Sequence, residues 1–428
     1  MNRPVSAADK PAVARAGKLL QSGIIFSAAS FLTGLGNLAF QCVLGRHLSG
    51  VAGQYGDANS ALNGLMTLLG LLPSVAAFAV THYIAHFNAS NDSAQLQGLL
   101  LGCKKFLLRL TVAGSVLAIL VAKPLGHFFH YGESLMLVTL ACALLGLWAA
   151  LVTALCQGLS WFKRLALIGF LGMILRVLFG WFVTLKWPSA ETAVLASAFA
   201  LLANLVLLFW KKELSLHGTP VSPWNREFVQ YLIVSAACVG GGFFFMQGDM
   251  LVMQHYFLSG ADRDAYATAE RLAVALPMTV GPLLAVLFAS RSGERAGNIV
   301  REQFKLLGLY ALGLLVGAAA LLALRDFCVK LILGKASPEA AAMIGQLALT
   351  MVFVGLLQAL ALWALASRWM KISLLYGGLG LAYWVTLLCL GQTPASLLRA
   401  MPIAALVSFA ILFAVWLVAM RRHKLDAS

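Results

Sequence analysis

Charged residues are scarce in this sequence, and acids are scarcer than bases. Only 11% of the 428 residues are charged, whereas 61% are hydrophobic. A soluble domain of this length needs more polar surface than that, so the composition excludes one. The 31 lysines and arginines outnumber the 16 acids and leave a formal net charge of +15.

Paired cysteines, a phosphate-binding loop and long connections are also missing. The seven cysteines are dispersed without a C-x-x-C pair, so we expect neither a disulfide framework nor a metal site. No G-x-x-x-x-G-K-S/T motif is present, which argues against a built-in ATPase, and we expect no cofactor. The short connections offer no sizeable loop to hold catalytic groups, which disfavours a membrane enzyme that polymerises or ligates glycans.

What the sequence does contain is a series of long apolar runs. Each is about twenty residues long, the length that a helix needs to cross the hydrocarbon core of a bilayer. The runs predict an all-α polytopic membrane protein with about twelve transmembrane helices, because a membrane barrel would show short alternating strands instead. Pro188 favours a turn between the fifth and sixth runs. The predicted spans are 22–45, 58–84, 104–123, 135–157, 165–185, 190–210, 229–257, 268–290, 304–324, 344–366, 371–391 and 398–420.

Lysine and arginine are distributed unevenly between alternate connections. With the N-terminus placed in the cytoplasm, 21 of them lie inside and 9 outside, and Arg176 lies within a span. This positive-inside bias predicts a multi-pass protein of the cell inner membrane with both termini cytoplasmic. The net charge then follows from topology and from attraction to anionic membrane lipid, and requires no nucleic-acid partner.

A weak internal repeat relates the two halves of the chain. Residues 45–50, Gly-Arg-His-Leu-Ser-Gly, precede Tyr55, and residues 255–260, His-Tyr-Phe-Leu-Ser-Gly, precede Tyr266; a proline-bearing span follows each tyrosine. With six spans per half, both copies insert the same way up. We therefore expect two six-helix bundles related by a parallel pseudo-two-fold repeat. The expected parts are an N-terminal bundle over 1–212, a cytoplasmic linker over 213–228 and a C-terminal bundle over 229–428.

The residues around these repeats carry a family resemblance. Residues 44–48, Leu-Gly-Arg-His-Leu, precede residues 53–56, Gly-Gln-Tyr-Gly, and the second span ends in residues 80–85, Val-Thr-His-Tyr-Ile-Ala. An acid, Asp249, precedes a loop that ends in Tyr266. In these features the chain resembles the Wzx-type polysaccharide (O-antigen) flippases of the MOP superfamily, relatives of lipid II flippases and MATE exporters.

The resemblance implies translocation of a lipid-linked (polyprenyl-diphosphate) oligosaccharide from the inner to the outer leaflet by alternating access, for surface polysaccharide biosynthesis. It implies a transporter rather than an enzyme, with H+ or Na+ coupling and polysaccharide polymerase machinery as candidate partners. The chain departs from the family pattern at Ala265, where glycine is frequent, and at Ala289, where proline is frequent. Two alternatives stay open: a MATE-like ion-coupled exporter of small molecules, and a membrane-embedded glycan polymerase or ligase.

Amide side chains lie within two of the apolar spans. Asn37 and Gln41 fall near one face of span 22–45, and Asn59 and Asn63 fall on one stripe of span 58–84. Lipid offers no hydrogen-bond partners to such groups, so they should face the bundle or a wet cavity. All four suit sugar hydroxyls as substrate-binding residues, and they equally suit hydrogen bonding between helices.

Arg176 is the most deeply placed charge. It lies twelve residues from Arg164 and ten from Lys186, where a guanidinium costs several kcal/mol unless it is solvated or paired. Its planar fork suits a diphosphate, so we predict that Arg176 binds substrate; the alternative is a structural partner between helices.

Asp249 is the acid buried in an apolar span. It lies near the outer end of span 229–257, and we predict that it binds a coupling proton or Na+; the alternative is that it neutralises an arginine. Glu270 and Arg271 stand at the start of span 268–290, where we expect solvated helix ends.

Overall fold

The computed structural model of the chain describes residues 32–90, 92–209, 226–291, 299–366 and 369–425. These residues form helices and no strand, so the predicted all-α class is confirmed. The N-terminal half holds a helix over 32–48, α2 (Gln54–Asn59), the π-helix η1 (Ser60–Leu65), α3 (Met66–Leu69), α4 (Leu71–Ala89), α5 (Ser93–Phe128), α6 (Glu133–Gly158), α7 (Phe162–Lys186) and α8 (Ala190–Phe209). The C-terminal half holds α9 (Arg226–Met246), α10 (Gly248–Tyr256), α11 (Gly260–Arg291), α12 (Ile299–Ala323), α13 (Arg325–Leu333), α14 (Pro338–Ala366), α15 (Met370–Leu390) and α16 (Pro394–Leu425).

Six of these helices are long and apolar enough to cross a membrane, judged by length and composition: α5, α6, α7, α14, α15 and α16. Two bent pairs, α9 with α10 and α12 with α13, raise the number to 8 if each pair forms one span. Each of the twelve predicted spans falls mainly on helix wherever it lies within the described residues. The chain is a polytopic α-helical membrane protein.

Local sequence accounts for several helix ends. The carboxylate of Asp92 accepts the backbone N–H of Gln95 at 2.9 Å, as an N-cap residue does at the start of α5. Gly334 ends α13 in the left-handed conformation, with φ of 72°. Helix α7 ends at Lys186 and α8 begins at Ala190, which confirms the turn predicted at Pro188.

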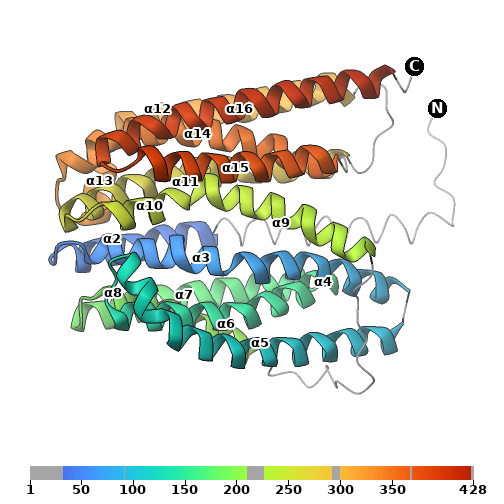
Figure 1. Cartoon of the computed structure of the whole chain (residues 1–428), viewed down its shortest axis with the longest axis horizontal. Coiled ribbons are helices and arrows are strands. Elements are labelled where there is room, and N and C mark those ends of the chain that lie inside the picture. The colour runs from blue at the N-terminus through green and yellow to red at the C-terminus, as the bar shows by residue number, and fades with distance from the viewer. Residues whose placement is uncertain (1–31, 91, 210–225, 292–298, 367–368, 426–428) are drawn as a thin grey trace.

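Figure 1 shows the two halves side by side, the first in blue and green and the second in yellow to red. In the first half α7 packs on α8 and α4 on α6; in the second α11 packs on α14 and α9 on α15. The halves meet where α11 contacts α2, α9 contacts α4 and α10 contacts η1. Most of the predicted linker, residues 213–225, lies outside the described residues, and the bundle boundaries remain a prediction.

Two predicted spans are interrupted where the halves meet. The second span contains η1, and the seventh bends by 48° at Gln247, between α9 and α10. The two interruptions are adjacent, because a Cβ atom added to Gly64 would lie 2.9 Å from Leu251 Cδ2. The predicted span 229–257 is therefore a bent pair of helices rather than a single straight one. Irregular backbone is tolerated at membrane depth where protein or a cavity covers it, and Trp384 Nε1 donates to the carbonyl of Gly248 at 3.0 Å.

Candidate functional site

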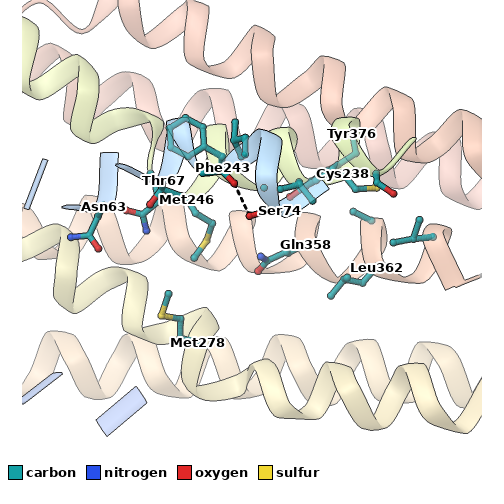
Figure 2. A pocket seen from close by; sticks show the side chains of 18 of the residues that line it. Asn63, Thr67, Ser74, Cys238, Phe243, Met246, Met278, Gln358, Leu362 and Tyr376 are labelled. Carbon is teal, nitrogen blue, oxygen red and sulfur yellow. Dashed lines mark hydrogen bonds between the residues drawn. The ribbon is translucent and has the colours of Figure 1, made fainter. Parts of the chain in front are cut away.

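A cavity of about 550 Å³ lies between the two halves. It extends from Asn63 on η1 and Gln247 at the break of the seventh span to Leu365, near the end of α14 (Figure 2). Its polar lining comes from seven neutral side chains and one charged one: Asn63, Thr67, Ser74, Ser235, Gln247, Gln358, Tyr376 and Arg271. Its larger apolar lining residues are Leu71, Val239, Phe243, Met246, Met278, Leu362 and Leu365. The described lining contains no acid.

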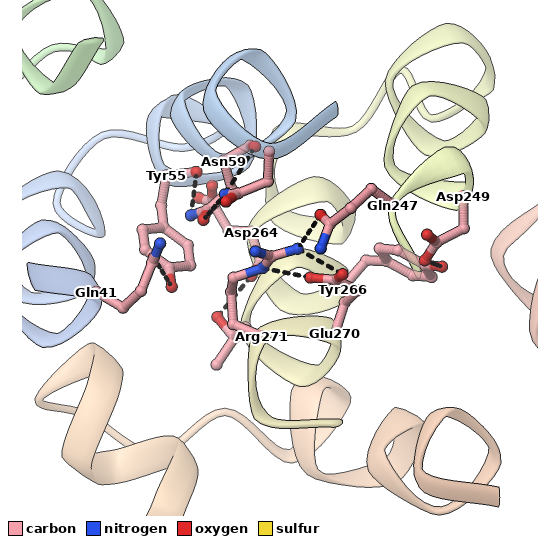
Figure 3. Close-up of polar contacts among 11 residues, drawn as sticks. Gln41, Tyr55, Asn59, Gln247, Asp249, Asp264, Tyr266, Glu270 and Arg271 are labelled. Carbon is pink, nitrogen blue, oxygen red and sulfur yellow. Dashed lines mark hydrogen bonds and ion pairs between the residues drawn. The ribbon is translucent and has the colours of Figure 1, made fainter. Parts of the chain in front are cut away.

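Arg271 on α11 is the cation of this cavity. Its Nη2 donates to Gln247 Oε1 at 2.7 Å, and its Nε and Nη2 pair with the carboxylate of Glu270 (Figure 3). The side chain of Arg271 is 9% exposed and that of Glu270 is 0% exposed. The prediction that these two residues are solvated helix ends was wrong, because α11 begins at Gly260 and so places Arg271 eleven residues inside the helix.

Asp249, the predicted ion-coupling residue, lies in the first turn of α10 and is buried. Its Oδ2 accepts the hydroxyl of Tyr266 at 2.5 Å, and that hydroxyl lies 3.2 Å from Met401 Sδ. Its Oδ1 has no hydrogen-bond partner among the described residues. Within the same residues Asp249 forms no ion pair, so the alternative of a directly neutralised arginine is not observed. Ion coupling remains a prediction.

Of the four amides predicted to bind substrate, only Asn63 lines the cavity. Its Nδ2 donates to Asn59 Oδ1 at 3.1 Å, while Asn59 is fully buried and donates to the carbonyl of Tyr55 at 3.0 Å. Gln41 is also buried, and its Oε1 accepts the hydroxyl of Tyr55 at 3.0 Å. In this conformation Gln41 forms a hydrogen bond between helices, as the alternative has it, whereas the hydrogen bonds of Asn59 stay within its own span.

Arg176 does not line this cavity. Its Nε donates to Ser197 Oγ at 2.9 Å and its Nη1 to Asn37 Oδ1 at 3.0 Å, so it joins α7 to α8 and to the helix over 32–48. Its Cζ lies 4.2 Å from the centre of the Phe40 ring. The two predicted residues Arg176 and Asn37 are thus brought together, with neutral partners and a ring face rather than an acid.

A set of polar contacts that we call the clasp joins the halves beyond the cavity, at the end opposite the C-terminus in Figure 1. Asp264 Oδ2 accepts the backbone N–H of Gly53 at 2.8 Å and Oδ1 that of Gly56 at 2.7 Å. Arg263 Nε lies 3.3 Å from Asp57 Oδ1. Because Gly53 precedes α2 and has no side chain, Asp264 from the other half takes the place of its helix cap. The clasp consists of Gly53, Gly56, Asp57, Ser60, Gln254, Arg263 and Asp264.

Gln254 on α10 lies in the middle of the clasp. Its amide donates to Asp57 Oδ1 at 3.0 Å and its Oε1 accepts the hydroxyl of Ser60 at 2.9 Å. Ser60 also bonds the hydroxyl of Tyr131. Burial raises the pKa of the Asp264 carboxyl despite the two backbone donors. Most buried polar groups of this contact therefore have a protein partner.

Sequence reasoning missed Gln247, Arg271 and the clasp. The sequence could have pointed to the two clasp glycines, because Gly53 and Gly56 belong to the motif that carries the family resemblance. No local pattern, however, links them to Asp264, which lies more than 200 residues away. Among the described residues no group of three or more His, Cys, Asp or Glu side chains could hold a metal ion.

No protein-family model matches the chain, and no curated protein matches it in sequence. The chain is similar to an inward-facing conformation of a multidrug resistance MATE family transporter of the MOP superfamily, with a TM-score of 0.70 and 14% identity over 95% of this chain and 99% of that one. It is similar to the lipid II flippase MurJ in an inward closed conformation, with a TM-score of 0.68 and 13% identity over 92% of this chain and 87% of that one. It is also similar to an outward-facing conformation of a multidrug resistance MATE family transporter of the MOP superfamily, with a TM-score of 0.57 and 14% identity over 95% of this chain and 96% of that one. These likenesses show that the chain has the MOP transporter fold.

Proposed function

We propose that the chain is an alternating-access transporter of the inner membrane that flips a lipid-linked, polyprenyl-diphosphate oligosaccharide from the inner to the outer leaflet, for surface polysaccharide biosynthesis. The cavity chemistry carries the proposal: one arginine, several neutral amides and hydroxyls, and no acid in the described lining. An anionic head group that enters a low-dielectric slab needs a fixed cation and is repelled by acids.

The remaining lining residues suit the other parts of such a substrate. Asn63, Gln247 and Gln358 offer donors and acceptors that match sugar hydroxyls. Leu71, Leu362 and Leu365 offer an apolar surface to isoprenoid carbon. In the N-terminal half, Arg176 with Asn37, and the amides Gln41 and Asn59, would meet the substrate once the halves rearrange.

Alternating access fits the relation between cavity and clasp. The clasp joins the two halves on one side of Arg271, and the cavity extends to the other side. The TM-score is 0.70 with the inward-facing MATE structure and 0.57 with the outward-facing one. This difference supports an inward-facing state. In this proposal both termini are cytoplasmic, Asp249 binds the coupling H+ or Na+, and release is to polysaccharide polymerase machinery.

A MATE-like ion-coupled exporter of small molecules is the second candidate. It is favoured by the similarity to the multidrug resistance MATE transporter, which covers 99% of that chain. The lack of an acid in the described cavity lining counts against a cationic drug as the substrate.

Complementation separates the two candidates. The gene should restore surface polysaccharide to a strain that lacks its own flippase, and Arg271→Ala at equal membrane abundance should not. A second strain, lacking its drug exporters, should show no change in the accumulation of a cationic dye. Restored dye efflux without restored polysaccharide would replace the flippase proposal with the exporter.

A further inference from the structure

Arg271 does not present a bare positive charge to the cavity, because the preceding residue neutralises it. The Glu270 carboxylate is fully buried and takes the Nε and Nη2 edge of the guanidinium. Gln247 accepts a second hydrogen bond from Nη2 at 2.7 Å. The pair therefore has no net charge, although only its positive member lines the cavity.

The third guanidinium nitrogen is used differently. Nη1 forms no hydrogen bond among the described residues, while the other two nitrogens are fixed by Glu270 and Gln247. Because a guanidinium is planar and rigid, fixing one edge also fixes the direction of the remaining donors. An anion in the cavity can bind to Nη1 without breaking the pair.

We propose that Glu270 is a specificity-determining counter-ion, which lowers the affinity of Arg271 for an anionic head group to a level that permits release. This inference rests on the proposed function and adds to it a residue that does not line the cavity described above. A transport site must bind its substrate well enough to load it and weakly enough to let it go. An unpaired arginine in a dry cavity would hold a diphosphate too tightly to be emptied on the far side.

The same arrangement selects the charge of the substrate. Attraction to Arg271 and repulsion by Glu270 both scale with the charge of the anion, so a net attraction at Nη1 binds a diphosphate more strongly than a singly charged anion. Gln247 lies at the break between α9 and α10, so the orientation of Arg271 also depends on the bend of the seventh span. Opening of that bend would remove one of the two supports of the guanidinium.

Binding of inorganic pyrophosphate to the purified full-length protein in lipid nanodiscs tests this role. Calorimetry should show tighter binding by Glu270→Gln than by the unchanged protein, on the order of tenfold, because one repelling charge is removed at short range. Glu270→Asp keeps the charge and should bind about as the unchanged protein does. Asp249→Asn removes another buried acid of the same half that does not pair with Arg271, and should tighten binding less than Glu270→Gln.

Translocation gives the second readout. With a fluorescent polyprenyl-diphosphate saccharide in reconstituted vesicles, Glu270→Gln should lower the maximal rate and the half-saturating concentration together, because release slows. A purely structural role for Glu270 predicts lower thermal stability with unchanged pyrophosphate affinity, and that result would overturn the inference. If the unchanged protein does not flip the probe, the proposed function itself fails. If it flips the probe and Arg271→Ala binds pyrophosphate and flips equally well, Arg271 is not the cation that binds the head group, and the inference about Glu270 fails while the function stands.

Discussion

Gln41 in the first half and Asp249 in the second each accept a hydrogen bond from a buried tyrosine that follows in the chain. Tyr55 donates to Gln41 Oε1 at 3.0 Å, and Tyr266 donates to Asp249 Oδ2 at 2.5 Å. The two acceptors are 208 residues apart and the two tyrosines 211, both close to the offset of about 210 residues of the sequence repeat. The acceptor in the first half is an amide and that in the second is a carboxyl, so of these two only Asp249 can exchange a proton or bind a cation by charge.

Asp249→Asn makes the second copy resemble the first and should abolish the response of transport to an H+ or Na+ gradient. The amide keeps an acceptor for Tyr266, so insertion and abundance in the membrane should not change. Transport in vesicles with and without an imposed gradient measures the effect. Gln41→Leu, which removes the acceptor of the other tyrosine, is the control, and whatever transport it retains should keep the gradient response. An unchanged response in Asp249→Asn would leave this residue with a packing role.

Arg176→Ala should lower translocation by about tenfold or more while the protein still inserts, because the cation that we propose for the substrate in the N-terminal half is lost. Arg176→Lys should recover part of the activity, since it restores the charge but not the planar fork. Surface glycan and membrane abundance are measured together. In the structural alternative, Arg176 only donates hydrogen bonds to Ser197 and Asn37. Arg176→Ala should then reduce the abundance of the protein in the membrane, and Asn37→Leu should show the same reduction.

Asp264→Ala should open the clasp. The substitution removes the acceptors of two backbone N–H groups, and hydrogen bonds to a charged group contribute about 1.5–3 kcal/mol each. The ratio of closed to open molecules should fall at least about tenfold. Spin labels at the exposed positions Val51 and Leu258, in a variant without the native cysteines, report the distance between the halves.

Asp262→Ala is the matched control for that experiment. Asp262 lies two residues away, and the structure shows only its backbone N–H in a hydrogen bond, to Ser259 Oγ at 3.4 Å. Its loss should leave the label distances unchanged. If Asp262→Ala and Asp264→Ala broaden the distribution of spin-label distances equally, the total negative charge of this segment holds the halves together, rather than the hydrogen bonds of Asp264.

Gly56→Ala should separate the halves by a steric effect. A Cβ atom at Gly56 would lie 2.6 Å from Arg263 Cβ and 2.8 Å from its carbonyl carbon. Relief of this overlap requires the backbone at Arg263 to move, which is more costly than rotation of a side chain. Gly50→Ala is the control, because a Cβ atom at Gly50 meets nothing within 4 Å. The same spin-label distances should lengthen in the first variant alone. Identical distances in both variants would show that Arg263 can move aside.

Much of the fold could be predicted because hydrophobic length decides which segments cross the membrane. The turn at Pro188 followed from local sequence. Arg271 was wrongly predicted to lie at a solvated helix end. The charged residues around it lower the local hydropathy, which does not reveal that the helix already begins at Gly260. Whether a polar residue of a span faces the cavity or another helix depends on the packing of distant segments, so Gln41 and Asn63 looked alike in sequence and differ in the structure.

The π-helix η1 has a rotational consequence for the second span. A π-turn accommodates about one residue more than an α-helical turn, so α2 is rotated by roughly 100° relative to the phase that an unbroken α-helix would give it. The segment before η1 faces the clasp through Asp57, and the segment after it faces the cavity through Thr67 and Ser74. Deletion of a single residue within 60–65 would restore regular winding and turn one of these faces away from its neighbours, without changing any side chain on either.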